Sequence, residues 1–271
     1  MRKALTIAAF VLVLLVTLVP LYWMVQISFK PNAEITQEGT LYPHTLTFDN
    51  YDRLFVKRNF GAYLRNSAAV TAASVFISLV FGSLAAYAIA RFRLWRRLER
   101  RIGLALLTAR IVPAVVIVVP VYLLILKLGL INTWLGLIII YTAFNVSFVV
   151  WMMESFFREI PVDLEEAAMV DGDSRLTAFR RIVLPLAAPG LAATAVFAVI
   201  VTFNEFLFAL VLTSTPAAMT VPRGTATLIG RIDVDIAAMG AAGVVAALPI
   251  VLFAILVQRH LVRGLTFGAV K

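Results

Sequence analysis

The chain has 271 residues, of which 62% are hydrophobic and only 14% are charged, and its mean hydropathy is +0.95. So few charges cannot cover a soluble globule of this size, so the composition excludes a soluble protein and indicates an integral membrane protein. The formal net charge of +9 is gathered in short segments beside apolar runs, which is the pattern of a membrane protein rather than of a nucleic-acid-binding one. No nucleic-acid partner is expected.

Six apolar runs follow one another along the chain, each long enough to cross a hydrocarbon layer of ~30 Å as a helix. Backbone polar groups find no water inside lipid, so unbroken runs of this kind are expected to be helical. The predicted fold class is therefore an all-α membrane protein with six transmembrane helices, forming a single transmembrane domain over residues 1–271. The predicted spans are 5–29, 66–90, 102–126, 134–157, 187–212 and 241–259.

Basic residues gather in four segments: the N-terminus, 91–101 (RFRLWRRLERR), 158–185 and 259–271. Segment 30–64 is more evenly balanced in charge. Cytoplasmic loops keep an excess of Lys and Arg, so the four basic segments and both termini are predicted to be cytoplasmic.

The fourth and fifth predicted spans are separated by a polar segment, EEAAMVDGDSRLTAFRRIVLP, at residues 165–185. Its pattern predicts two short amphipathic helices that meet at a glycine in left-handed conformation. A side-chain oxygen is expected to cap the second helix, and a proline is expected to end it. The boundary residues are Pro161, Gly172, Asp173 or Ser174, and Pro185.

Two environments remain open for this segment. Arg180 and Arg181 would suit a loop that lies on lipid headgroups. Against that, anionic lipid would repel the four carboxylates of the segment, which are those of Glu165, Glu166, Asp171 and Asp173. The charges favour contact with another protein.

The same segment resembles the EAA loop of ABC importer permease subunits, and we call residues 158–185 the EAA loop. The shared pattern is Glu166-Ala167-Ala168, three residues, Gly172, nine residues and Ile182-Val183-Leu184-Pro185. Other stretches are similar to the second, six-span subunit of carbohydrate importers of the maltose-transporter type. They are NTWLGLIIIY, FFREIPVDLEEAA, PLAAPGLAATAVF, FNEFLFAL and RGLTFGAVK. The chain departs from the family at Phe203, where a tryptophan is usual.

The resemblance implies a permease subunit of an ATP-driven importer of sugars or related polyhydroxy solutes, in the cytoplasmic (inner) membrane of a bacterium. Its implied partners are a second permease subunit in a heterodimer, two ATP-binding subunits, an extracytoplasmic substrate-binding protein and the lipid bilayer. The EAA loop would act as a coupling helix inserted into a cleft of an ATP-binding subunit. The implied contacts are Glu165, Glu166, Ala167, Ala168, Asp171, Gly172, Arg180 and Arg181 in the loop, and Gly264, Leu265, Thr266 and Gly268 in the C-terminal tail.

Polar residues within predicted spans are candidates for the substrate path, because buried polar groups are costly in lipid. The candidates are Tyr141, Asn145, Phe203, Asn204 and Glu205, with types suited to binding sugar hydroxyls and faces. The alternative, that Glu205 pairs with a neighbouring subunit and Asn204 bonds a helix backbone, remains equally open. By resemblance, loops 30–64 and 213–240 would form the docking surface for the binding protein, with Asp233 and Asp235 as candidate contacts.

Two other classes of protein are weaker alternatives. Asp171-Gly172 superficially resembles the motif of membrane phosphotransferases, but the alanine, arginine and second aspartate pair of that motif are missing, and the two histidines, His44 and His260, lie far apart. No lysine follows a glycine, so a Walker A loop is absent and ATP and Mg²⁺ would be bound by partner subunits. A non-ABC channel would not explain an EAA loop. No catalytic residue, metal site or cofactor of its own is expected.

Overall fold

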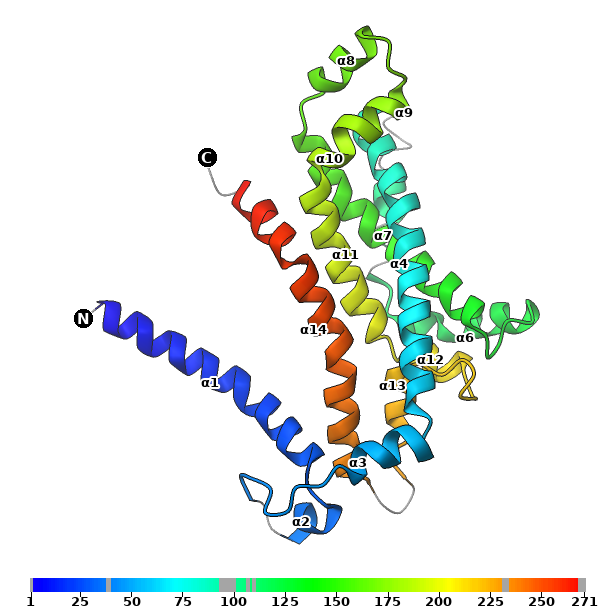
Figure 1. Cartoon of the computed structure of the whole chain (residues 1–271). Coiled ribbons are helices and arrows are strands. Elements are labelled where there is room, and N and C mark those ends of the chain that lie inside the picture. Colours follow the sequence, from blue (N-terminus) through cyan, green and yellow to red (C-terminus); the bar gives the residue numbers. More distant parts are fainter. Residues whose placement is uncertain are drawn as a thin grey trace.

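The computed structural model describes residues 2–37, 40–92, 101–105, 108, 111–230 and 234–267. Within them the chain is helical apart from turns and a single β-bridge between Ile229 and Val234. The long helices α4, α7, α11 and α14 pack together as an elongated bundle (Figure 1). Helix α1 leans away from the bundle and contacts α14, while α8 and α9 lie at one end of the bundle and α2 and α3 at the other.

The helices have the following bounds, in which η marks a π-helix: α1 Arg2–Ser28, α2 Asn32–Gln37, α3 Asp49–Asp52, η1 Arg53–Lys57, α4 Phe60–Arg91, α6 Ala114–Lys127, α7 Trp134–Glu159, α8 Asp163–Val170, α9 Arg175–Ala178, η2 Phe179–Val183, α10 Leu184–Leu186, α11 Ala188–Phe203, α12 Leu207–Leu212, α13 Val221–Ala226 and α14 Ile236–Phe267.

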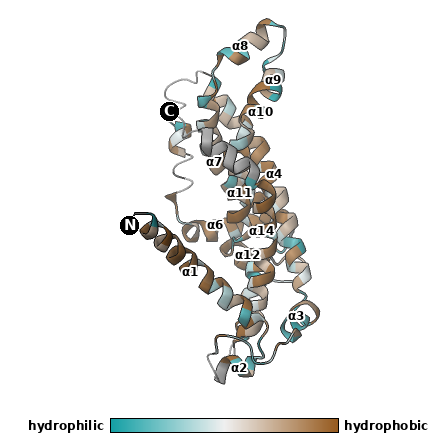
Figure 2. Cartoon of the chain, turned by 60° about the vertical axis from the view of Figure 1, so that its left-hand side comes forward, coloured by the Kyte–Doolittle hydropathy of each residue, from teal (hydrophilic) through white to brown (hydrophobic). Residues whose placement is uncertain are grey.

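Four helices in the described part of the chain are long and apolar enough to cross a membrane: α1, α4, α7 and α14. Their positions agree with the predicted spans 5–29, 66–90, 134–157 and 241–259. The segments Arg175–Leu186 and Ala188–Phe203 meet at a bend of 74° and together would make a fifth span. Hydrophobic residues predominate along α1, α6 and α14, and hydrophilic ones gather around α2, α3, α8 and α9 (Figure 2).

The predicted third span, 102–126, is not one continuous helix. Helix α6 begins only at Ala114 and has 14 residues, because Pro113 before it is extended with ψ of 134°. Proline lacks an N–H group and its ring clashes with the preceding turn, so it ends the helical segment before it. The 14 residues of α6 are fewer than the ~20 that a span requires. Arg110, beside this break, lies outside the described residues.

The predicted fifth span, 187–212, is also interrupted. Helix α11 ends at Phe203 and α12 starts at Leu207, with residues 204–206 outside both helices. The apolar run gave no sign of this break, since it contains neither glycine nor proline there. The polar side chains of Asn204 and Glu205 make the local hydrogen bonds that replace the helical ones, as described below.

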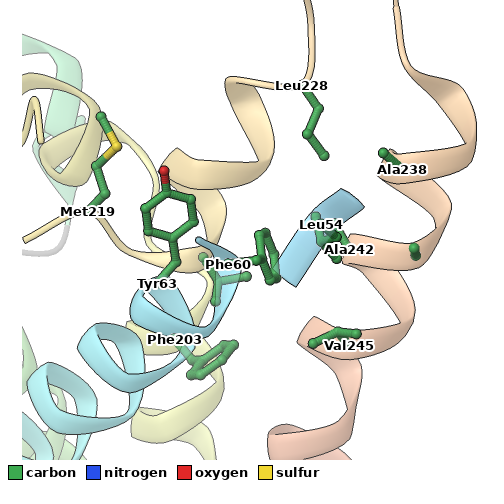
Figure 3. Close-up of a cluster of buried hydrophobic side chains, with 11 residues drawn as sticks. Leu54, Phe60, Tyr63, Phe203, Met219, Leu228, Ala238, Ala242 and Val245 are labelled. Atoms are coloured by element: carbon green, nitrogen blue, oxygen red, sulfur yellow. The ribbon is translucent and has the colours of Figure 1, made fainter. Parts of the chain in front are cut away.

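The bundle is closely packed at two centres. At the α4–α7 contact, a side chain on Gly82 would meet Val149 Cγ1 at 2.6 Å, so only glycine allows this approach. A second centre joins α4, α11 and α14 around Phe60, Tyr63 and Phe203 (Figure 3). These contacts fix the long helices relative to one another.

At the end of the bundle away from α8, the described residues within 29–59 and 213–235 form what we call the distal cap. Buried amide side chains hold it together: Asn50 donates to the carbonyls of Ser28 and Lys30, both at 2.8 Å. Asp235 was a candidate contact for a binding protein, but its carboxylate accepts from Ala238 N at 3.1 Å at the start of α14 and pairs with Arg53 at 3.6 Å. Asp233 lies outside the described residues.

Candidate functional site

Helix α8 forms the tip of the EAA loop, beyond the end of the bundle (Figure 1). It ends where Gly172 adopts φ of +99°, and the N–H groups of Gly172 and Asp173 donate back to Met169 and Ala168. Ser174 Oγ then accepts from Thr177 N at 3.2 Å at the start of α9. The predicted glycine elbow and serine cap are thus confirmed.

The second helical segment of the loop is longer than predicted. It continues without a break through α9, η2 and α10 to Leu186, so the expected end at Pro185 is wrong. The wide π turn of η2 comes just before Pro185, and Leu184 N donates to Phe179 O within it. This irregular turn accommodates the proline inside the segment. The bend of 74° follows, before α11.

Most of the predicted coupling residues lie on the surface. Glu166, Ala167, Asp171, Gly172, Arg180 and Arg181 are exposed, and Ala168 is partly buried. Arg181 pairs with Asp173 at 3.3 Å, but its side chain is 72% exposed, so this pair contributes little stability. Apolar side chains are exposed beside them, above all Val170 at 87%. The tip of the loop therefore presents a mixed charged and apolar surface.

Glu165 is the exception, because its side chain is only 4% exposed. Its Oε2 accepts from Tyr87 OH at 2.6 Å and its Oε1 from Arg91 Nε at 2.5 Å. Arg91, which is also 4% exposed, donates a further bond to the carbonyl of Ile160 at 2.8 Å. Glu165 is expected among the contacts with an ATP-binding subunit, but in this structure the ion pair holds its side chain inside the chain.

Sequence reasoning missed Tyr87 and Arg91. Tyr87 packs against Phe157 of α7 and Phe179 of η2, with ring centroids 6.0 Å and 4.6 Å away. Arg91 was counted only as one of the basic residues that set membrane orientation. The sequence carries no signal for this pairing, because the burial of Glu165 is a tertiary feature and its partner lies 74 residues earlier in the chain.

The five candidates for the substrate path are brought together only in part. Tyr141 and Asn145 are buried in the packing of α7, where Tyr141 OH donates to Glu205 Oε2 and Asn145 Nδ2 to Thr202 Oγ1, both at 2.7 Å. Phe203 lies in the apolar centre of Figure 3 and is 5% exposed. Of the five, Asn204 alone has an exposed side chain in this structure.

Glu205 closes the break between α11 and α12. Its carboxylate oxygens accept from Phe208 N at 3.0 Å and Ala209 N at 3.2 Å, so it caps the N-terminus of α12. Asn204 bonds the carbonyl of Ile200 within α11 at 2.8 Å. In this conformation Asn204 bonds a helix backbone, as the alternative from the sequence expects, whereas Glu205 bonds the backbone of α12 and Tyr141 of α7 within the same chain.

The predicted tail contacts Gly264, Leu265 and Thr266 lie near the C-terminal end of α14, which extends to Phe267. Gly268 lies outside the described residues. Within the described part of the chain, His, Asp and Glu form no group of three or more that could hold a metal ion.

A membrane-embedded helical bundle with a projecting pair of short helices between two spans is the architecture of an importer permease. The family of binding-protein-dependent transport system inner membrane components matches residues 60–267. The chain belongs to this family, and it is a permease subunit of an ABC importer. Permeases of this family are not themselves enzymes.

Curated relatives match nearly the whole chain. The trehalose transport system permease protein SugB of Mycobacterium tuberculosis is 39% identical over 257 residues, covering 94% of this chain and 92% of the relative. The trehalose/maltose transport system permease protein MalG of Thermococcus litoralis is 35% identical, covering 100% of this chain and 98% of the relative. A bacterial ABC transporter that imports the acidic polysaccharide alginate contains a chain of the same fold, with a TM-score of 0.77 at 23% identity over 95% of both chains.

Proposed function

We propose that this permease imports a sugar, an oligosaccharide or a related polyhydroxy solute by alternating access driven by a separate ATPase. Two of the relatives described above support this proposal: one is named for trehalose transport and the other for trehalose and maltose transport. The structure with the same fold belongs to a polysaccharide importer. Which of these solutes is the cargo is tested by a separate experiment below.

The EAA loop is proposed as the docking site for an ATP-binding subunit. The observation that carries this step is the exposed tip of α8: Val170 is 87% exposed and Leu164 44% exposed, beside the exposed Glu166. An apolar surface on a helix of eight residues outside the bundle is stabilised when a partner covers it. Each complete transporter would contain two such subunits, and these would bind ATP and Mg²⁺. The end of α14 with Gly264, Leu265 and Thr266, and the Gly268 that follows, would be a second contact.

A second permease subunit is proposed to complete a heterodimer. Helix α1 has no buried residues in its most apolar window, and its main contact with the bundle is with α14. A groove of about 400 Å³ between α4, α11 and α14 is lined almost wholly by apolar side chains, including Val75, Phe76 and Phe253. These surfaces suit a neighbouring transmembrane subunit. A path between two subunits would be lined by both of them. The side chains of the path residues would therefore gain new partners from the second subunit.

In the proposed topology the chain crosses a bacterial inner membrane six times, with both termini and the EAA loop in the cytoplasm. Arg91 ends α4, Arg158 lies in the last turn of α7 and Arg175 begins α9, so all three lie at the loop end of the bundle, which agrees with the excess of positive charge in cytoplasmic segments. The third crossing would combine α6 with the helical residues before Pro113. The distal cap would then face the outside and receive the substrate-binding protein.

Reconstitution of the complete transporter in proteoliposomes tests the docking step. Gly172→Pro forces φ away from +99°, and Glu166→Ala removes an exposed acid from α8, so both should abolish the ATP hydrolysis that the loaded binding protein stimulates. Membrane insertion of both variants should remain normal. Unchanged stimulation in both would refute docking at the EAA loop.

A cysteine crosslink gives a direct readout, because the chain contains no cysteine. Val170→Cys should crosslink to a cysteine in the ATP-binding subunit, whereas Val56→Cys in η1, where the valine is 72% exposed at the other end, should not. The cargo is tested separately by uptake of radiolabelled trehalose, maltose and a polyol. Saturable uptake of none of them, with a loaded binding protein present, would count against a carbohydrate cargo.

A further inference from the structure

The backbone alone does not fix the orientation of α8. On one side Ile160 is extended, with φ of −80° and ψ of 124°, and Pro161 follows it. On the other side Gly172 has φ of +99°, and a Cβ added there would meet nothing within 4 Å. A helix of eight residues is also too short to be stable alone. Side-chain contacts must therefore decide how α8 sits on the bundle.

The contacts that hold α8 are directional and buried. Within the described residues, Glu165 is the one buried side chain of α8. Both of its oxygens accept short hydrogen bonds from α4, one from Tyr87 and one from Arg91. Arg91 also donates to the carbonyl of Ile160, so a single guanidinium fixes both the helix and the linker that leads into it. We call Tyr87, Arg91 and Glu165 the clasp.

The second half of the loop meets α4 through rings instead. Phe179 stacks obliquely on Tyr87 with centroids 4.6 Å apart, and the guanidinium of Arg175 lies 4.9 Å from the ring of Phe92. Apolar and cation–π contacts tolerate small shifts of one surface over another, because their energy changes gently with distance. A buried charged hydrogen bond does not, since breaking it leaves a charge without a partner.

We propose that the clasp is the joint through which motion of α8 reaches α4, with Arg91 and Tyr87 as positioning residues. This inference rests on the proposed docking of an ATP-binding subunit at the EAA loop. Helix α4 packs along α7 through the close contact at Gly82, so a displacement of the inner end of α4 is carried along both helices. Without the clasp, a displacement of α8 would be taken up at the non-helical linkers on either side of it, around Ile160 and Gly172, instead of moving α4. The clasp therefore determines how much transport each hydrolysed ATP produces.

The test uses two clasp variants in the complete reconstituted transporter. Glu165→Gln keeps the shape of the side chain but removes its charge, and Tyr87→Phe removes one hydroxyl while keeping the ring. ATP hydrolysis should continue in both, while cargo transported per ATP falls, by roughly ten-fold for Glu165→Gln and by a smaller factor for Tyr87→Phe. The matched control is Glu154→Gln, which removes the acid of an exposed pair with Arg158 on α7. It should leave transport per ATP unchanged.

A distance measurement distinguishes a clasp that transmits motion from α8 to α4 from one that only stabilises the fold. Spin labels at Val170→Cys in α8 and Phe81→Cys in α4, both exposed, report the separation of the two helices. The label pair should give one narrow distance distribution with the native clasp and a broad one in Glu165→Gln. If either transport per ATP or the distance distribution is unchanged in both Glu165→Gln and Tyr87→Phe, the proposal is overturned.

The distance measurement also separates this proposal from the docking proposal. It is made on the full chain in lipid nanodiscs, with and without the ATP-binding subunits. A missing crosslink from Val170→Cys in the otherwise native transporter would refute docking at the loop. A narrow distribution in both clasp variants refutes the clasp even where the crosslink forms.

Discussion

The EAA loop and the distal cap lie at opposite ends of α4, and different chemistry attaches them to it. Neutral amide bonds attach the distal cap to α4: Asn66 of α4 donates to the carbonyls of Pro216 and Met219 at 2.9 and 2.8 Å. A buried ion pair between Arg91 and Glu165 holds the EAA loop. Amide bonds fasten a segment with little cost in desolvation, whereas a buried ion pair is stable only in one geometry.

This difference suits the two proposed roles. The distal cap has many separate attachments, so losing one would loosen a local segment. Helix α8 has one concentrated attachment to α4, through the buried side chain of Glu165, so losing it would release the whole of α8. The comparison predicts unequal effects for similar deletions at the two ends.

The largest effect is expected for Arg91→Ala. It leaves the Glu165 carboxylate buried without its cation, which costs about 3–5 kcal/mol in the free energy of unfolding. Denaturant unfolding in mild detergent measures this loss. The control is Arg158→Ala, which breaks an exposed pair with Glu154 on α7 and should cost at most about 1 kcal/mol. Equal losses of unfolding free energy in the two variants would show that the buried ion pair contributes no more to stability than the exposed one.

The second effect concerns the distal cap. Asn66→Ala removes both donors to the carbonyls of Pro216 and Met219, and unpaired buried carbonyls cost about 1–3 kcal/mol. Faster hydrogen exchange should be confined to residues 213–221. Asn204→Ala, at an exposed amide that bonds only Ile200, is the control and should change stability by less than about 0.5 kcal/mol. Exchange that spreads to the EAA loop would mean that the two ends are coupled more tightly than their separate attachments imply.

Local features of the EAA loop could be predicted from the sequence, because they depend on neighbouring residues. Gly172 ends α8 since a left-handed residue is needed there, and Ser174 caps α9 because its hydroxyl lies within reach of Thr177. The ion pair of Arg91 and Glu165 could not be predicted, since 74 residues separate its partners. A charge count can assign Arg91 to a membrane side but cannot say which acid it meets.

The long apolar helices can be predicted from the composition, but only one of the two interruptions discussed above has a signal in the sequence. Pro113 could have been read as the end of a helix, because proline disfavours a helical residue before it. The break at 204–206 has no such signal. It depends on Glu205 reaching the N–H groups of Phe208 and Ala209, and on Tyr141, 64 residues away, donating to the same carboxylate. Tertiary contacts of this kind override the helical pattern of an apolar run.

The third prediction compares glycines with positive φ at the two ends. Gly172 in the EAA loop has φ of +99° and Gly129, between α6 and α7, has φ of +68°, and neither would bring an added Cβ within 4 Å of another group. Alanine at either position should therefore cost only the backbone strain, about 1–2 kcal/mol. The stability losses should be similar, but only Gly172→Ala should reduce the ATP hydrolysis stimulated by the loaded binding protein. A reduced stimulation in Gly129→Ala as well would contradict a special role for the elbow of the loop.

The smallest effect is a pH dependence confined to the distal cap. The backbone N–H of His44 donates to the Glu34 carboxylate at 2.9 Å and lowers the pKa of Glu34 below its ordinary value of 4.5, with further bonds from Thr45 and Thr40 and the charge of Lys30. Partial burial of the carboxylate opposes the shift. A lowered folded-state pKa contributes stability that is present above pH 4.5 and is lost as the pH falls through the folded value.

Glu34→Gln isolates this contribution, because glutamine does not titrate and offers a single acceptor oxygen. The variant should unfold at a lower temperature than the native chain at pH 7, and the difference should shrink as the pH falls below 4.5. The EAA loop should show no counterpart, since the bonds of the Glu34 carboxylate are to residues of the distal cap, at the other end of the bundle. A difference between the native chain and the variant that stays constant from neutral pH downward would mean that the Glu34 carboxylate stabilises the cap by its shape rather than by its charge.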